Sequence, residues 1–204
     1  MEQVLSVVLF LVVLVPSVIL HEVAHGLVAL RFGDDTARQA GRLTLNPVPH
    51  IDPFGTVILP ALLVFTTGTA FGYARPVPVT TSRLRRPRDH GLLVSLAGPA
   101  TNIVLAGVAA LVLRALLPDG DPLVLDLIFR FGIINAVLAA FNLLPVPPLD
   151  GSAVVERVLP RRMLPGWRRM TRYAMPVVLL LVLLAPGLLG RVLRAAGDLW
   201  VQLL

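Results

Sequence analysis

The segment His21-Glu22-Val23-Ala24-His25 places two histidines four residues apart, with a glutamate beside the first of them. In a helix this spacing puts both imidazoles on one face, where both can bind a single metal ion. Glu22 then lies a step around the helix, where its carboxylate can deprotonate a metal-bound water without being a ligand. Zinc lowers the pKa of such a water toward about 7. The segment therefore predicts metal-assisted hydrolysis.

Two histidines leave a catalytic zinc ion one protein ligand short, because such sites have three. Asp150 is the candidate for the third ligand, since it closes a proline-rich break after an apolar run. Gly151 follows it and allows a sharp turn, so the carboxylate can point back toward the histidines. The alternative is that Asp150 caps a helix at about residues 152–158, and the local sequence by itself favours this N-cap role.

The elements that must position these residues are long apolar runs. Hydrophobic residues make up 56% of the 204 residues and charged residues 15%, and the mean hydropathy is +0.81. Soluble domains carry roughly a quarter charged residues. A histidine, a glutamate and a second histidine inside a membrane helix would each cost roughly 2.5 kcal/mol or more near its centre. A chance cluster is thus a poor alternative to a functional site in an integral membrane protein.

We predict an all-α polytopic membrane protein with about four spanning helices and a re-entrant segment with short β-strands. The alternation of polar and apolar residues predicts the strands at 42–46 and 76–79, the second only at a sheet edge because of its prolines. Residues 191–204 indicate a short amphipathic helix at the membrane interface. The four predicted spans are residues 4–30, 91–117, 123–144 and 174–184, the last extending to 189.

The chain is predicted to form one membrane-embedded domain, with a core at about residues 4–158 and accessory C-terminal helices at 174–204. Every basic residue is an arginine, and the arginines gather in the loops after the first span and after the 123–144 span. The positive-inside rule places these loops in the cytoplasm and the N-terminus outside. Residues 56–71 must then enter and leave on one face, which predicts the re-entrant segment. No basic helix with interleaved aromatics indicates a nucleic-acid partner.

Three motifs together resemble the site-2 protease family over about residues 15–155. They are the HExxH motif, the segment Gly98-Pro99-Ala100-Thr101-Asn102 in the next span, and the pattern Asn142-x-x-Pro145-x-Pro147-x-Leu149-Asp150-Gly151. The resemblance implies an intramembrane zinc endopeptidase that cleaves transmembrane segments of membrane proteins within the lipid bilayer.

The resemblance also implies the roles of individual residues. One zinc ion per chain is held by His21, His25 and Asp150, and Glu22 is the general base. Asn142, and with it Asn102, faces the active site and contacts the substrate backbone or the developing oxyanion, a role that suits an amide donor. An interhelical hydrogen bond is the alternative for Asn102.

Residues 46–56 resemble a segment of small bacterial members without a PDZ domain, which implies a bacterial plasma membrane. With the arginine-rich loops in the cytoplasm, the HExxH motif and the active site are expected to lie near the cytoplasmic face. His50 in this segment is expected to support the site from behind or to end a strand, since three ligands already suffice. Asn135 lies on the same helix face as Asn142, and a hydrogen bond within the bundle is expected for it. The predicted strands at 42–46, with Leu43 and Leu45, and at 76–79 are expected to bind an extended substrate by strand addition.

A metal-ion transporter or a non-proteolytic membrane metal-binding protein is the main alternative, because it too would place His and Asp inside a helix bundle. A transporter has no need of Glu22 between the histidines, and such proteins usually show internal repeats. No repeat is visible in this sequence. The chain has no cysteine, so thiolate ligands are excluded.

Overall fold

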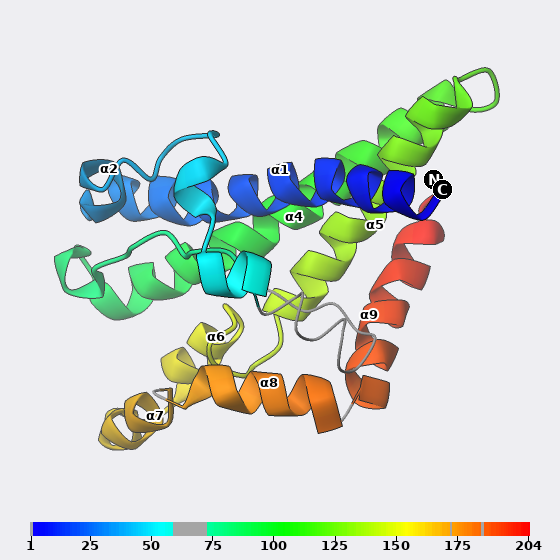
Figure 1. The fold of residues 1–204 in the computed structure, drawn as a ribbon. Helices are drawn as coiled ribbons and strands as arrows, with labels where there is room; N and C mark the ends of the chain where they lie inside the picture. Colours follow the sequence, from blue (N-terminus) through cyan, green and yellow to red (C-terminus); the bar gives the residue numbers. More distant parts are fainter. Residues whose placement is uncertain (1, 59–72, 172, 185) are drawn as a thin grey trace.

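Three long helices form the centre of the computed structural model, which describes residues 2–58, 73–171, 173–184 and 186–204. They are α1 (Glu2–Arg31), α4 (Pro87–Leu116) and α5 (Pro122–Asn142). α4 and α5 pack as an antiparallel pair, and α1 crosses both of them (Figure 1). All three are long and apolar enough to cross a membrane, α1 over Val7–Arg31. The chain is an integral membrane protein.

Local chemistry determines where these helices begin and end. Gly33 follows α1 with φ 105°, a left-handed conformation that favours glycine, and it turns the chain so that the Asp34 N–H donates to the Ala29 carbonyl at 2.9 Å. Asp121 caps α5, since its Oδ1 accepts the Leu123 and Val124 N–H groups at 2.9 and 3.2 Å. Both ends are therefore sequence-encoded.

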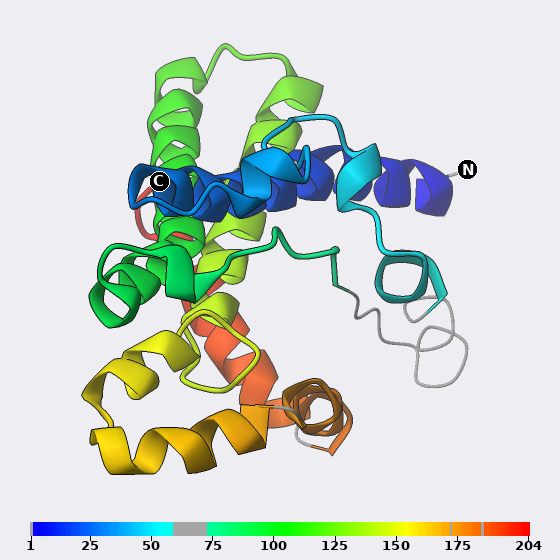
Figure 2. The same cartoon turned by 90° about the vertical axis from the view of Figure 1, so that its left-hand side faces the viewer.

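The connection from α1 to α4 contains α2 (Thr36–Gln39), η1 (Val48–His50), the π-helical turn η2 (Pro53–Ile58) and η3 (Thr81–Arg83). Residues 73–80 run below α1 in the view of Figure 2. The Arg85 N–H donates to the Phe32 carbonyl at 3.0 Å and so brings the start of α4 beside the end of α1. The predicted re-entrant segment at 56–71 falls almost wholly outside the described residues.

The strands predicted at 42–46 and 76–79 are wrong, since neither stretch is a strand in the structure. In the first stretch, backbone groups that a strand would use for pairing make local hydrogen bonds instead. The Asn46 N–H donates to Thr44 Oγ1 at 3.1 Å, and the Thr44 carbonyl pairs with the His50 ring at 3.0 Å. In the second, Pro76 and Pro78 have no N–H to donate. Residues 43–45 are bent, and within the described part of the chain no residue pairs with 76–79 in a sheet.

The C-terminal third of the chain forms α6 (Ser152–Val158), η4 (Arg161–Met163), α7 (Leu164–Thr171), α8 (Ala174–Leu184) and α9 (Pro186–Val201). α8 has 11 residues, or roughly 16 Å of helix, and a hydrocarbon core is about 30 Å thick. The fourth predicted span is therefore not confirmed, and the described residues contain three candidate spans.

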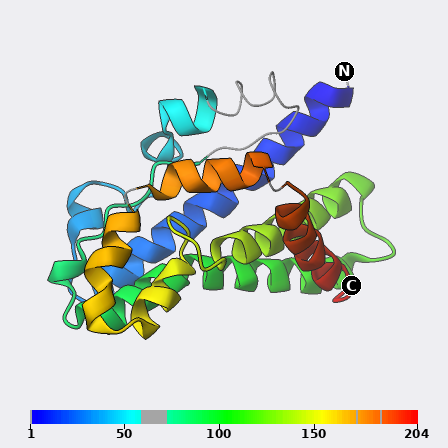
Figure 3. The same ribbon diagram turned by 90° about the horizontal axis from the view of Figure 1, so that it is seen from below.

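The last helix also differs from the predicted interfacial helix at 191–204. α9 begins at Pro186 and packs along α5 (Figures 1 and 3). Its Trp200 is only 2% exposed and donates its indole N–H to the Ala106 carbonyl at 2.8 Å. Gly132 of α5 leaves room for the indole, since a Cβ there would lie 2.7 Å from its Cη2 atom. Trp200 thus anchors α9 inside the bundle.

Candidate active site

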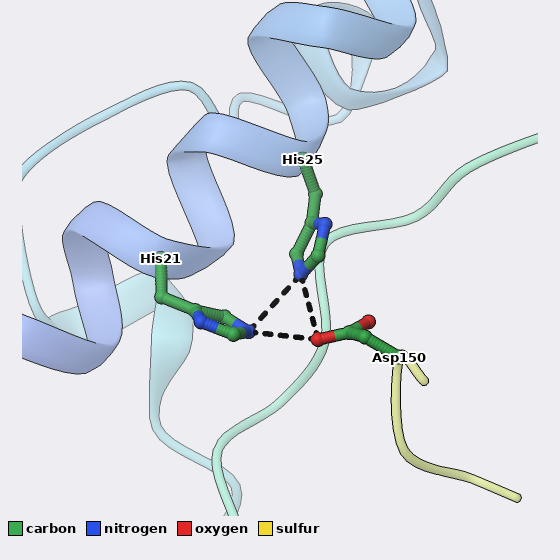
Figure 4. Close-up of side chains that lie close together, drawn as sticks. All are labelled: His21, His25 and Asp150. Atoms are coloured by element: carbon green, nitrogen blue, oxygen red, sulfur yellow. Dashed lines mark hydrogen bonds and ion pairs between the residues drawn. The ribbon is translucent and has the colours of Figure 1, made fainter. Parts of the chain in front are cut away.

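His21, His25 and Asp150 converge on one point, although the aspartate is 125 residues away from the nearer histidine in the sequence. The Asp150 Oδ2 atom lies 3.2 Å from His21 Nε2 and 3.4 Å from His25 Nε2. The two Nε2 atoms are 3.1 Å apart. Figure 4 shows both rings reaching from α1 toward the carboxylate, which comes from the loop before α6. The three side chains therefore form a compact triangle.

The loop after α5 brings Asp150 back to α1. The Gly151 N–H donates to the Asn142 carbonyl at 2.7 Å, which closes the proline-rich loop on itself. A side chain at Gly151 would meet the loop, because a Cβ would lie 2.6 Å from the Leu144 carbonyl oxygen. Gly151 is the N-cap residue of α6, and no side chain caps this helix. The N-cap alternative for Asp150 is therefore wrong.

α4 approaches the histidines closely enough to hold them. The Nδ1 atom of His25 lies 2.7 Å from the Val94 carbonyl oxygen, and a carbonyl only accepts, so this nitrogen carries the proton and Nε2 presents a lone pair. His21 Nδ1 lies 2.5 Å from Asn102 Oδ1. The close approach depends on Gly98, where a Cβ would lie 2.6 Å from both Cε1 and Nε2 of His21.

The triangle fits a zinc ion. Ligand atoms about 2.0–2.1 Å from a tetrahedral zinc lie roughly 3.3–3.4 Å apart, and the three edges measure 3.1, 3.2 and 3.4 Å. The lone pair of His25 Nε2 faces the Asp150 carboxylate, and two facing acceptors repel each other unless a cation lies between them. Two imidazoles and one carboxylate are also a donor set of catalytic zinc sites.

Glu22 lines a cavity of about 270 Å³ together with the triangle and Asn142. Its Oε2 atom accepts the Val77 N–H at 2.8 Å. Asn142 donates one amide hydrogen to the Leu138 carbonyl at 3.0 Å, and it lines the same cavity at the end of α5. The cavity thus gathers a carboxylate and an amide beside the triangle.

The extended residues 75–80 are fastened on both sides of Val77. The buried Arg42 guanidinium donates to the Arg75 carbonyl at 2.5 Å. The buried Asp34 carboxylate accepts the Thr80 N–H at 2.6 Å. These two contacts hold Val77 against Glu22.

The Asp34 carboxylate is itself stabilised in its charged form. Burial by itself would raise the pKa of Asp34, but hydrogen bonds from the Thr36 hydroxyl and from the Thr80 and Thr36 amides outweigh it and lower the pKa below its ordinary value. Asp34 follows the span at the end of α1 and is ionised at neutral pH, where it holds residue 80 in position.

Several residues predicted for the site lie elsewhere. Asn102 is fully buried behind His21 and does not line the cavity. Leu45 is 64% exposed, and neither it nor Leu43 lines the cavity. His50 pairs with the Thr44 carbonyl and is not part of the triangle. Asn135, for which a hydrogen bond within the bundle was predicted, is buried and bonded to Asn102 and Ser17, as expected.

Gly98, Val77 and Asp34 also shape the site, and no individual role was predicted for any of them. Gly98 could have been found, because a glycine in the span that must face HExxH indicates close helix contact. Val77 acts through its backbone N–H, which leaves no signal in residue type.

A carboxylate and two histidines at zinc-ligand spacing, with a glutamate beside them inside a membrane helix bundle, define the metallopeptidase class of site. The comparisons with known proteins agree with this class. Residues 9–119 and 121–185 match the protein family described as Peptidase family M50. The chain belongs to this family, the site-2 proteases, and it is a zinc metalloendopeptidase by class.

The relatives come from bacteria and archaea, and three illustrate the similarity. The chain is 44% identical over 164 residues to "Putative zinc metalloprotease YwhC" of Bacillus subtilis, covering 76% of this chain and 72% of the relative. It is 34% identical over 140 residues to "Putative zinc metalloprotease Rip2" of Mycolicibacterium smegmatis, covering 69% and 53%. It is 32% identical over 178 residues to the protein of the same name from Mycobacterium tuberculosis, covering 85% of this chain and 66% of the relative. No solved structure gives a significant match.

Proposed function

We propose that this protein is an intramembrane endopeptidase that cleaves transmembrane segments of membrane proteins, with His21, His25 and Asp150 holding its one zinc ion. The observation that carries the proposal is the position of the triangle. Both histidines lie inside the candidate span Val7–Arg31, so the reaction takes place below the lipid surface. A peptide bond that reaches this point comes from a segment that is itself in the membrane.

Glu22 acts as the general base. Zinc, when bound, supplies Lewis acidity at the carbonyl that is attacked. The Val77 N–H holds one carboxylate oxygen of Glu22 at 2.8 Å, which orients the second oxygen toward the cavity. This second oxygen takes the proton of the attacking water and passes it to the leaving amine.

Asn142 stabilises the charge that develops on the carbonyl oxygen. One of its amide hydrogens is used by the Leu138 carbonyl, and the other serves as the donor toward the cavity. A fixed amide donor needs no reorganisation during the reaction, which is why such donors contribute strongly to catalysis.

The substrate lies against residues 76–79 in an extended conformation. Cleavage of a transmembrane helix requires local unwinding, because each peptide bond is otherwise enclosed in helical hydrogen bonds. Val77 and Val79 line the cavity and present extended backbone beside the triangle. We therefore keep substrate binding by strand addition for residues 76–79 only. Leu43 and Leu45 do not line the cavity, and the proposal does not include them.

The site faces the cytoplasmic side of a bacterial plasma membrane. Arginines crowd the segments at the end of α1, at the start of α4 and around α6 and α7, whereas the turn between α4 and α5 carries Asp119 and Asp121. The positive-inside rule places the arginine-rich end in the cytoplasm. Water reaches the cavity most easily from that end.

The test is Glu22→Gln in the purified full chain, reconstituted in vesicles with a reporter protein that has one transmembrane helix. We expect one bound zinc per chain and a complete loss of cleavage. Glu156→Gln is the matched control, because Glu156 pairs with Arg168 and does not line the cavity, and it should cleave normally. Persistent cleavage by the Glu22 variant, or a wild-type chain that transports zinc without cleaving the reporter, would refute the proposal.

A further inference from the structure

Three polar side chains lie behind His21, in the middle of an otherwise apolar bundle. Ser17 comes from α1, Asn102 from α4 and Asn135 from α5, and each is fully buried. Neutral polar groups in such surroundings are costly unless they are hydrogen-bonded. Two asparagines and a serine from three different helices therefore need an explanation beyond packing.

Two backbone carbonyls determine the direction of the hydrogen bonds among them. Ser17 Oγ–H donates to the Val13 carbonyl at 2.8 Å, so the same oxygen accepts the Asn135 Nδ2–H at 2.9 Å. Asn135 Nδ2 also donates to the Phe131 carbonyl at 2.8 Å. A carbonyl can only accept, so the amide nitrogen of Asn135 must point at Phe131 and Ser17. The Asn135 Oδ1 atom is left as an acceptor.

The direction of the two hydrogen bonds between Asn135 and His21 follows from the same argument. Asn102 Nδ2 donates to Asn135 Oδ1 at 2.7 Å, which turns the Asn102 Oδ1 atom toward His21 Nδ1 at 2.5 Å. An amide oxygen cannot donate, so Nδ1 of His21 carries the proton. The lone pair of His21 therefore lies on Nε2, which faces Asp150 and His25.

We propose that Ser17, Asn135 and Asn102 form a positioning relay that fixes the tautomer and the ring orientation of His21 for zinc. This inference rests on the proposed role of His21 as a ligand. Without Asn135 the Asn102 amide could turn over, and its nitrogen would then force the His21 proton onto Nε2, where it would occupy the ligand position. His25 needs no such relay, because the Val94 carbonyl determines its tautomer directly.

The relay makes Asn102 a positioning residue and not a substrate-binding one. It also gives Asn135 an effect on zinc although Asn135 contacts neither histidine. Groups that orient metal-bound histidines typically change metal affinity by about 10- to 100-fold when they are removed. A residue that only packs the bundle would change thermal stability and leave zinc affinity in the folded protein unaltered.

The experiment measures zinc affinity of the full chain in detergent by competition with a chromophoric chelator, together with ¹⁵N NMR of the histidine rings in the metal-free protein. Asn102→Leu and Asn135→Leu should weaken zinc binding by about 10-fold or more and should shift His21 away from the Nδ1–H tautomer. Asn102→Asp restores an acceptor oxygen at His21 and should bind zinc more tightly than Asn102→Leu. Thr101→Val, next to Asn102 but outside the cavity and the relay, is the control and should bind as the wild type does.

Unchanged zinc affinity and tautomer in folded Asn102→Leu and Asn135→Leu would overturn the relay while the proposed protease function stands. If either leucine variant does not fold, Ser17→Ala replaces it, because it removes the acceptor for Asn135 at the cost of one local bond to the Val13 carbonyl, and it should also weaken zinc binding. A wild-type chain that binds no zinc would overturn the relay and the proposed function together.

Discussion

Replacing Gly98 by alanine inserts a methyl group between α4 and the two histidines. The new Cβ would lie 2.6 Å from both Cε1 and Nε2 of His21, and closer still to Nε2 of His25. Ordinary contacts between carbon atoms lie at about 3.5–4.0 Å, so the overlap is roughly 1 Å. The rings cannot simply rotate away, because their Nδ1 atoms are held by Asn102 and by the Val94 carbonyl.

The triangle or the helix must therefore move by more than a zinc site tolerates, since ligand distances hold to about 0.2 Å. Overpacking of this kind costs about 1–3 kcal/mol. If the strain falls on the metal-bound arrangement, zinc affinity should drop roughly 5- to 150-fold. The measurement is chelator competition on the purified chain, followed by cleavage of the membrane reporter at saturating zinc.

Gly107→Ala is the matched control for this variant. Gly107 lies on the same helix, and a Cβ there meets nothing within 4 Å. This variant should keep wild-type zinc affinity and turnover, and it should gain up to about 1 kcal/mol of helix stability. A Gly98→Ala protein that binds zinc and cleaves as the wild type does would refute the argument that this glycine sets the approach of α4 to the site.

Three further predictions follow from the contacts around the cavity. Val77→Pro removes the N–H that holds Glu22, so turnover should fall by about 10-fold or more, as expected for a hydrogen bond to a charged group. The control Val77→Ala keeps the N–H and should retain turnover. The zinc content of both variants should equal that of the wild type. Asn142→Leu should lower kcat by about 10²- to 10³-fold without loss of zinc, and an unaltered kcat would exclude Asn142 as the oxyanion donor. Asp34→Asn should lose about 1–3 kcal/mol of stability at neutral pH. Because the folded state lowers the pKa of Asp34, the carboxylate stabilises the fold above its unfolded pKa of about 3.9 and loses this effect as the pH falls through the folded pKa. The melting temperatures of wild type and Asp34→Asn should therefore differ at pH 7 and converge in acid, and a constant difference would contradict the assignment.

Part of the site could be predicted because it depends on local spacing alone. His21 and His25 face the same side of α1 through the i, i+4 repeat of any helix, and Glu22 follows from its place between them. The three spans at 7–31, 87–116 and 122–142 follow from apolar length in the same way. These features need no knowledge of what packs against the helix.

Other features could not be predicted, because local patterns compete with tertiary contacts. The alternation at 42–46 is consistent with a strand, but side chains such as Thr44 satisfy the backbone locally before any neighbour can pair with it. Trp200 fits an interfacial anchor by type, yet Gly132 on another helix provides room for its ring inside the bundle. Neither outcome can be read from a window of neighbouring residues.

Hydropathy and helical periodicity act within one segment, and for that reason the membrane environment, the pair of histidines and the glutamate beside them can be predicted from the amino-acid sequence. The tertiary structure alone decided that Asp150 faces the histidines instead of capping α6, since the local sequence favours the cap. It also decided that Asn102 orients His21 from behind. Both features depend on contacts between α1, α4 and the loop after α5. These contacts result from the packing of the whole helix bundle, and no single segment encodes them.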